Sequence, residues 1–461
     1  MKHVIKILIL ALLVVNLSAC KKFLERPPEG QLTEEQALKT EADVRAFSNG
    51  VYTLIADGNF YGGRHQVLNE LFGDHYKGDF FTGDFSEIYK RQNSIFGGTR
   101  DNYYKKAYEI IARSNLLLTK LDLVTTQKNL VEGEAKLFRG MAYFELVRMF
   151  AQPWGYTTDN SHLGVPLRTS LDLTSKARAT VAEIYSQIIA DMSSAETLLP
   201  DVTANGKFYS ATKWAAKAYL AKVYFQQNNF VKAFQYSNEV ITSNKFVLDA
   251  NFSNRFSLGL STEGILTIAD DANGFRPGGD LRGSFRSDVG LPNFRFTDQY
   301  YGIANARAAD LRRAWYSNTL QAGFNLLTKY NKNNFELPLV HLTEITLIRA
   351  EAGAETGGAN LAVAITDINR LMTRAYGGTA FNLLPAASAS SVISTVRSER
   401  ELEMVGEGNR TQEIKRIGAR NGTNVDRRNS PWNCNGFILQ FPKAEQDANT
   451  AFIMNIEGGC F

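Results

Sequence analysis

Apolar side chains recur at every third or fourth position over several long stretches of the chain, which is the spacing of one helix face. Short or moderate connections join these stretches, and this favours antiparallel helix pairs. A first helix is expected to begin with Thr33 as N-cap, with Gln36 completing a capping box, and to run through Val51. Further helices are predicted over residues 104–118, 130–150, 181–199, 212–227, 231–242, 342–356, 359–375 and 392–417.

A weak repeat lies inside these helices. Gly140 precedes Tyr143, and Ala221 precedes Tyr224, so a small residue lies one turn before a tyrosine on the same face; Ala233 follows at partner-helix spacing. The pattern resembles tetratricopeptide units, although no strict repeat of about 34 residues is present. We therefore predict a mainly α fold of degenerate, tetratricopeptide-like helix pairs, and we interpret the two tyrosines as core packing.

Two regions interrupt the helical pattern. Residues 57–100 are rich in Gly, Asp and aromatic residues, with one short helix expected around Val67–Phe72. Residues 250–335 are also loop-rich, with short strands expected at Gly264–Ala269 and Gly323–Lys329. Loops of this length inside a compact domain are usually functional or disordered, and the aromatic residues argue against disorder.

The N-terminus has the features of an export signal. A basic start, residues 2–6, precedes the uncharged apolar run Ile7–Val15. The run is too short for a membrane span, which needs about 20 residues, but it fits a secretory signal. It ends in Leu17-Ser18-Ala19-Cys20, which is similar to a bacterial lipoprotein box. We expect cleavage of residues 1–19 and lipidation of Cys20; the alternative is an ordinary signal peptide ending near a cysteine.

Composition and charge exclude several classes of protein. A hydrophobic content of 44% is too high for a disordered chain. The 51 basic and 47 acidic residues nearly balance at +4, which argues against a nucleic-acid binder. Removal of residues 1–19 takes away two lysines and no acid, which leaves +2. No later stretch reaches the roughly 18 uninterrupted apolar residues of a span, so the mature body is expected to be tethered by lipid.

Most catalytic signatures are missing. The chain lacks G-x-x-x-x-G-K-[ST], H-E-x-x-H, G-x-S-x-G and C-x-x-C, and we expect no cofactor. Asp270–Gly274 is similar to the start of a calcium loop but lacks the distal glutamate, so no metal is predicted. A carboxylate pair for glycoside hydrolysis depends on tertiary distances, and no single carboxylate is picked out by its context.

Cys434 and Cys460 are the remaining cysteines. An exported lipoprotein meets an oxidising compartment, so we predict that the two form a disulfide. Two buried free thiols are the alternative.

The C-terminal third resembles the SusD/RagB family. That family has a helix that reads roughly R-x-E-R-x-x-E-L-x-x-E-G-x-R, followed by D-L-x-R-W-G. Met404, Glu413 and Ile417 replace the usual Leu, Asp and Trp. The positions that fall on the pattern are Arg397, Glu399, Arg400, Glu403, Glu407, Gly408 and Arg410. Other matches are Cys20–Leu24, Leu32–Glu34, Leu347–Ala352 and Phe441–Glu445 with Asn449 and Asn455.

The resemblance implies a mostly helical scaffold and an outer-membrane lipoprotein that acts as a binding lid over a SusC-like TonB-dependent transporter. Proteins of this family capture oligosaccharides or, in some branches, peptides, and they are not enzymes. As an alternative to the resemblance, the Arg/Glu-rich helix is an ordinary solvated face with i,i+4 ion pairs.

Ligand contacts are expected on the two loop-rich regions. Sugars present apolar CH faces that stack on aromatic rings, and their hydroxyl groups need Asn, Asp, Arg or His partners. The candidates from both regions are Tyr61, Arg64, His65, Asp74, Tyr76, Phe81, Phe85, Arg295, Tyr300, Trp315 and Tyr316.

The expected organisation is a cleaved signal over residues 1–19, a lipidated tether over 20–30 and a single domain over 31–461. Within the domain, the helical scaffold covers about 104–250, the ligand side about 57–100 and 250–335, and a C-terminal helical part about 336–461. The function expected is glycan binding and delivery to the transporter. The alternatives are the same role for oligopeptides and a surface glycoside hydrolase.

Overall fold

The structure is a computed structural model that describes residues 37–172, 174–203, 208–269, 278–378 and 387–460. The predicted signal, Cys20, the tether, the Thr33 cap and Asp270–Gly274 lie outside these residues. The helices are α4 (Glu41–Ile55), α5 (Arg64–Phe72), α6 (Gly83–Tyr89), α7 (Gly98–Thr119), α8 (Lys128–Phe150), α9 (Val181–Leu198), α10 (Lys213–Gln226), α11 (Phe230–Thr242), α12 (Gly279–Phe285), α13 (Asp298–Asn305), α14 (Leu342–Thr356), α15 (Ala359–Ala375), α16 (Ala389–Glu403), α17 (Arg410–Asn421) and α18 (Lys443–Ala448).

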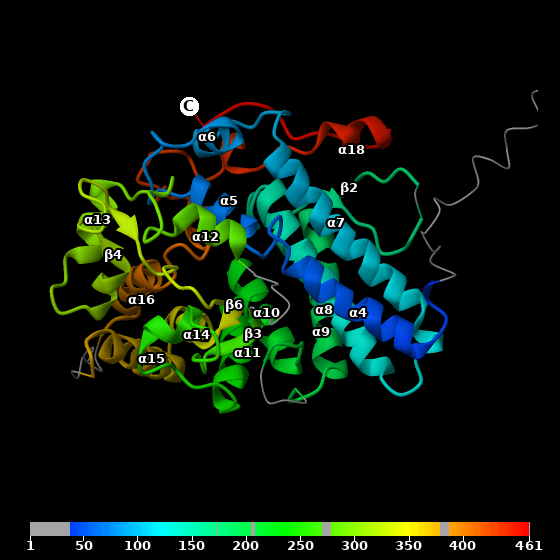
Figure 1. The fold of residues 1–461 in the computed structure, drawn as a ribbon, viewed down its shortest axis with the longest axis horizontal. Helices are drawn as coiled ribbons and strands as arrows, with labels where there is room; N and C mark the ends of the chain where they lie inside the picture. Colours follow the sequence, from blue (N-terminus) through cyan, green and yellow to red (C-terminus); the bar gives the residue numbers. More distant parts are fainter. Residues whose placement is uncertain (1–36, 173, 204–207, 270–277, 379–386, 461) are drawn as a thin grey trace, which may run out of the picture.

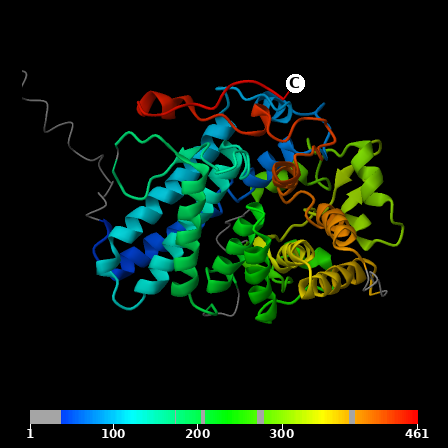
Figure 2. The same cartoon turned by 180° about the vertical axis from the view of Figure 1, so that it is seen from behind.

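The helices form two groups. Helices α4, α7, α8 and α9 lie side by side at one end, α14, α15 and α16 lie at the other, and α10 and α11 lie between them (Figures 1 and 2). None of the described helices is long and apolar enough to cross a membrane. Because most elements are helices and the strands are short, the predicted mostly helical fold class is confirmed.

Small residues set the distance between paired helices. A Cβ built on Gly140 of α8 would lie 3.2 Å from the side chain of Met192 on α9. A Cβ on Gly353 of α14 would lie 2.7 Å from the carbonyl oxygen of Asn360 on α15. Tyr143 is fully buried, as expected for core packing, whereas Tyr224 is partly exposed and stacks on Tyr236 of α11. These close approaches are the packing that the tetratricopeptide-like pattern predicts.

Several helix predictions are confirmed at both ends, including residues 342–356 and 359–375. The single helix predicted over 392–417 is wrong, because the chain forms α16 and α17 with a turn between them. Gly406 and Gly408 have φ angles of +76° and +77°, in the left-handed region that glycine adopts without a Cβ clash. These two glycines, which follow the end of α16, therefore interrupt the periodic pattern that predicted one helix.

The helix that contains Val51, α4, begins later than predicted. Thr40 is its N-cap, and the Thr40 and Asp43 side chains form the reciprocal capping box. Non-helical backbone at residues 38–40 separates α4 from residue 37, so one helix does not run from Thr33 through Val51. The sequence holds two competing cap signals, and periodicity alone did not separate them.

The strands are short: β1 (Leu163–Pro166), β2 (Arg178–Thr180), β3 (Gly264–Ala269), β4 (Tyr316–Ser317), β5 (Leu326–Leu327) and β6 (Glu336–His341). They pair antiparallel as β1 with β2, β3 with β6 and β4 with β5. The strand predicted at Gly264–Ala269 is confirmed, whereas only Leu326–Leu327 of the second one is a strand. The sequence prediction missed β6, whose unbroken burial gives no alternating pattern, and the short helices α6, α12 and α13.

Candidate ligand-binding face

The two loop-rich regions lie against each other. Tyr76 and Phe296 form an isolated antiparallel bridge. On either side of it, the Lys77 amide donates to the Arg295 carbonyl and the Thr297 amide donates to the His75 carbonyl, each at 2.8 Å. Helices α5, α6, α12 and α13 gather in this part of the molecule (Figure 1). We call the surface of these helices and their loops the loop face.

Most of the predicted ligand contacts are buried. Seven of the eleven have an exposed fraction of 5% or less: Tyr61, Asp74, Tyr76, Phe81, Tyr300, Trp315 and Tyr316. The Tyr76 ring stacks on Phe296 with centroids 4.9 Å apart, and the Tyr300 and Tyr316 hydroxyl groups lie 3.2 Å apart. The Trp315 ring lies 4.2 Å from the Lys329 ammonium. These rings contact protein atoms and support the loops from within.

Arg64 and Phe85 lie nearer the surface. The Arg64 Nε atom is 2.8 Å from a carboxylate oxygen of Asp280, which joins α5 to α12. Its guanidinium carbon lies 5.7 Å from the Phe85 ring centroid. Both side chains are partly exposed, so they remain within reach of a ligand.

Arg295 forms the centre of an aromatic platform with Phe80 and Phe324. Its guanidinium carbon lies 3.3 Å from the Phe80 centroid and 4.6 Å from the Phe324 centroid. The two rings are partly exposed and come from different loop regions. The Nε atom donates to the Pro292 carbonyl at 2.8 Å, and among the described residues no carboxylate lies within 4.0 Å of the guanidinium. Burial lowers the pKa of Arg295.

Sequence reasoning missed Phe80 and Phe324. Phe80 precedes Phe81 in the chain and lies in a turn, which the Phe81 amide closes by donating to the Gly78 carbonyl at 3.2 Å. Phe81 is buried at 5% exposure, whereas Phe80 reaches the surface. This adjacency of two phenylalanines was the available signal. Phe324 had no such signal, because only the folded chain brings it beside Arg295.

Asp74 belongs to an ion-pair cluster with His75 and Glu401. Arg410 contacts Asp74 at 2.6 Å, and Arg427 contacts Glu401 at 2.6 Å. Burial alone would raise the pKa of Glu401, but the hydrogen bond from His75 and nearby positive charges lower it to about 2. The candidate metal-ligand atoms of Asp74, His75 and Glu401 lie within 4.8 Å of one another. The two guanidinium groups already supply the positive charge that a cation would bring.

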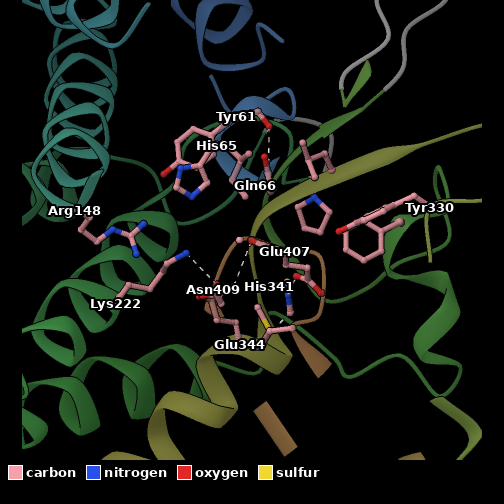
Figure 3. Close-up of a pocket in the computed structure, with 16 residues that line it drawn as sticks. Tyr61, His65, Gln66, Arg148, Lys222, Tyr330, His341, Glu344, Glu407 and Asn409 are labelled. Atoms are coloured by element: carbon pink, nitrogen blue, oxygen red, sulfur yellow. Dashed lines mark hydrogen bonds and ion pairs between the residues drawn. The ribbon is translucent and has the colours of Figure 1, made fainter. Parts of the chain in front are cut away.

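Tyr61 and His65 line a small polar cavity beneath the loop face (Figure 3). Its volume is about 30 Å³, and one water molecule needs roughly 10–15 Å³. Burial lowers the pKa of His65 to about 4, so its ring is neutral near pH 7. Ligand pockets usually occupy about 300–1,000 Å³. The cavity therefore has room for about two water molecules and is too small for an oligosaccharide.

The family-like Arg/Glu motif forms a buried charge lattice. Glu403 contacts three guanidinium groups, at 3.0 Å to Arg255, 3.3 Å to Arg312 and 3.1 Å to Arg374. Glu407 contacts the Lys329 ammonium at 2.6 Å. The solvated-face alternative is wrong, because these partners come from distant segments and Glu403 is fully buried. We call this set, with Glu399 and Glu263, the charge lattice.

The C-terminal segment is fixed to the scaffold. A disulfide joins Cys434 to Cys460, with their Cα atoms 5.1 Å apart. The side-chain amide of Asn455 donates to the backbone carbonyl of Phe150, at the end of α8, at 2.8 Å. The side-chain amide of Asn449 donates to the backbone carbonyl of Lys176 at 2.8 Å. The terminal Asn positions of the motif thus bond to the main chain of other segments.

Comparison with known proteins places this geometry in a family. Residues 22–225 match a SusD-like family model described as "Starch-binding associating with outer membrane". Residues 205–453, just over half of the chain, match the model of the SusD family. Among curated proteins, SusD-like protein P2 of Formosa agariphila is 29% identical over 252 residues, covering 53% of this chain and 48% of that protein. The chain spans about half the length of the curated relatives it matches.

Solved structures have the same fold. A putative sugar binding protein from Bacteroides vulgatus superposes with a TM-score of 0.77 at 25% identity, covering 91% of this chain and 99% of that one. A SusD superfamily protein from Bacteroides thetaiotaomicron gives a TM-score of 0.78 at 21% identity, with 91% and 100% coverage. Together with the family model that spans residues 205–453, this shows that the chain belongs to the SusD family.

Proposed function

We propose that this protein is a non-catalytic lipoprotein of the outer membrane that binds oligosaccharides and delivers them to a SusC-like TonB-dependent transporter. Family membership carries the proposal, since one matching family model is described as starch-binding and associating with the outer membrane. A solved relative from Bacteroides vulgatus is described as a putative sugar binding protein. Cys20 is the proposed site of the lipid anchor.

The ligand site that we propose is the aromatic platform with its surroundings on the loop face. The partly exposed rings of Phe80 and Phe324 can stack on the CH faces of sugars. The Arg295 guanidinium between them has N–H groups that no carboxylate of the described chain neutralises, and these can donate to sugar hydroxyl groups. Arg64 and Phe85 extend the same surface. The buried tyrosines and Trp315 of the predicted set hold the platform in place.

The charge state of the nearby acids supports binding without hydrolysis. A glycosidase needs one carboxylic acid with a raised pKa to protonate the leaving group. In the ion-pair cluster under the loop face, the pKa of Glu401 is lowered to about 2, and that of Asp74 lies below its usual range. Both groups are carboxylates near pH 7, so neither suits the role of general acid.

Affinity electrophoresis in gels that contain soluble polysaccharides tests the binding. We expect one or more glycans to retard the protein without release of reducing ends. Release of sugar that disappears on substitution of one Asp or Glu would instead establish a hydrolase. Retention of peptides with no retained glycan would establish the oligopeptide role.

Anchor and partner need a separate measurement. We expect wild-type protein in the outer-membrane fraction and a Cys20→Ala variant in the soluble fraction. Affinity purification of the anchored protein is expected to recover a TonB-dependent transporter from detergent-solubilised membranes. Recovery of Cys20→Ala in the membrane fraction at the wild-type level would contradict the lipid anchor.

A further inference from the structure

A groove lies beside helix α7 of the scaffold, away from the loop face. It is formed by α7, by residues 168–172 and by α18, and its volume is about 560 Å³. That volume falls within the range of about 300–1,000 Å³ that is usual for ligand pockets. The three segments meet near β2 (Figure 1). None of the eleven ligand contacts predicted from the sequence lines it.

The groove holds a cation and an anion that have not paired. Arg168 and Glu445 both line it, and among the described residues neither has an opposite charge within 4.0 Å. The third charge, Asp172, is neutralised by Lys176 at 3.0 Å. The Arg168 guanidinium donates one hydrogen bond, to the Thr174 carbonyl at 3.1 Å, and Glu445 accepts one from Asn449 at 3.0 Å. Donors on one residue and acceptors on the other remain available to a ligand.

A buried hydroxyl group lies beside these charges. Tyr104 is 5% exposed, and its ring packs against Tyr108, which lines the groove, with centroids 4.6 Å apart. The field of Glu445 raises the pKa of Tyr104 beyond the effect of burial, and the charge of Arg168 opposes it, so both side chains are near. Tyr104 does not itself line the groove, so it supports the groove wall from behind.

The remaining wall is apolar. Leu171 is 40% exposed, and Ala112 and Ala448 are exposed beside it. Apolar walls with a few convergent polar groups are typical of a small-molecule site. Because the charges of Arg168 and Glu445 cancel, the groove does not select for a charged ligand. The hydroxyl groups of a sugar both donate and accept hydrogen bonds, so one neutral sugar can bond to Arg168 and Glu445 together.

We propose that this groove is a second carbohydrate site, which takes a short, neutral oligosaccharide between Arg168 and Glu445 with its CH face on Leu171 and Ala448. The inference depends on the proposed glycan-binding function but not on the aromatic platform. The two sites use different side chains, and each can therefore be removed without the other.

The test is calorimetric titration of the full chain with maltotriose, cellotriose, xylotriose and mannotriose. Ala448→Trp fills the groove from an exposed position of α18, and Gln446→Trp places the same ring on the opposite side of that helix as a matched control. In a Phe80→Ala/Phe324→Ala background, we expect at least one trisaccharide to bind still. Ala448→Trp is expected to weaken that binding more than 10-fold, Glu445→Gln about 3- to 10-fold, and Gln446→Trp less than 2-fold.

The outcomes separate the two proposals. Binding that the platform substitutions abolish and Ala448→Trp leaves unchanged would overturn the groove site and leave the proposed function standing. Binding that only Ala448→Trp removes would support the groove and overturn the platform. If no trisaccharide binds to the wild-type protein, the groove proposal fails, and the polysaccharide gels then decide the proposed function separately. If tripeptides bind with the same sensitivity to Ala448→Trp and trisaccharides do not, the neutral-sugar assignment is overturned.

Discussion

The arginines of the charge lattice and Arg295 of the aromatic platform have different partners. In the charge lattice, Arg255 and Arg312 are at most 1% exposed and each contacts Glu403. In the aromatic platform, Arg295 is also buried, at 8% exposure, but it packs against two partly exposed rings and has no carboxylate within 4.0 Å among the described residues. A paired, buried arginine fixes its neighbours, whereas one held by rings keeps donors for a ligand. The difference indicates that the family-like motif holds the fold, and it supports the binding role proposed for Arg295 on the loop face.

The largest effect is expected from Glu403→Gln in the lattice. The substitution removes the carboxylate that three buried guanidinium groups share, and it leaves them only their other partners, such as Glu263 and Glu399. Removal of one partner from a buried ion pair typically costs about 3–5 kcal/mol. We expect the free energy of unfolding, measured by urea titration, to fall by that amount or the protein to lose its fold.

The matched control is Asp298→Asn on the loop face. Its side chain is 81% exposed and pairs with Lys77 at 3.1 Å. Exposed pairs contribute about 0–1 kcal/mol. Equal losses from the two variants would remove the distinction between a structural lattice and a solvated loop face.

The disulfide tests how much the C-terminal segment adds to stability. Cys434 and Cys460 are separated by 26 residues, and a loop of that size stabilises by about 3–4 kcal/mol in the chain-entropy model. We expect Cys434→Ser/Cys460→Ser to lower the unfolding free energy by this amount, and a reducing agent to bring the wild-type protein to the same value. Two reactive thiols in denatured, unreduced protein would contradict the pairing.

Local signals predicted the scaffold well and its interruptions poorly. Helix α14 was predicted at both ends, because apolar spacing and the glycines at 357 and 358 agree. The 392–417 segment kept an apolar period across Gly406 and Gly408, and the positive φ angles of these glycines are not visible in periodicity. Strand β6 is buried at every position, so it lacks the alternation that identifies a strand.

For the candidate site, the sequence predicted the region better than it predicted the individual side chains. The Gly-, Asp- and aromatic-rich composition located both loop regions, which the Tyr76–Phe296 bridge joins on one face. Composition does not say which ring of Phe80-Phe81 points outward. It also does not show that Trp315 covers the Lys329 ammonium. Those facts depend on contacts between residues far apart in the chain, which a single sequence does not display.

Lys415 is a buried cation outside the charge lattice that has carbonyl groups and not carboxylates as partners. Its ammonium donates to the Arg148 carbonyl at 2.7 Å at the end of α8, and no carboxylate of the described chain lies within 4.0 Å. Burial, with the charge of Arg148, lowers its pKa to about 7. The unfolded value is about 10.4, so between these values the unfolded state binds more protons. Stability therefore rises with pH from this group, by at most about 1.4 kcal/mol per unit.

Substitution of Lys415 by Met isolates that contribution. We expect the wild-type minus Lys415→Met difference in unfolding free energy to move in favour of the wild type by roughly 2 kcal/mol between pH 7 and 9. Lys329 also has a lowered pKa, about 8, but it is present in both proteins and cancels. A difference that is constant across this range would mean that Lys415 is not desolvated as the structure indicates.

The smallest expected effect comes from substitutions in the aromatic platform. They are expected to change the affinity for a glycan and not the stability of the protein. Phe80→Ala/Phe324→Ala removes the two rings that can stack on a sugar, and stacking contributes about 0.5–1.5 kcal/mol per aromatic contact. We expect about a 10-fold loss of affinity for the retained polysaccharide, with tryptophan at both positions restoring it. Tyr156→Ala, which removes a ring that is 41% exposed outside the platform, is the control. If the alanine pair binds as tightly as this control, the platform has no role in binding, and the position of Arg295 between two rings is only a packing feature.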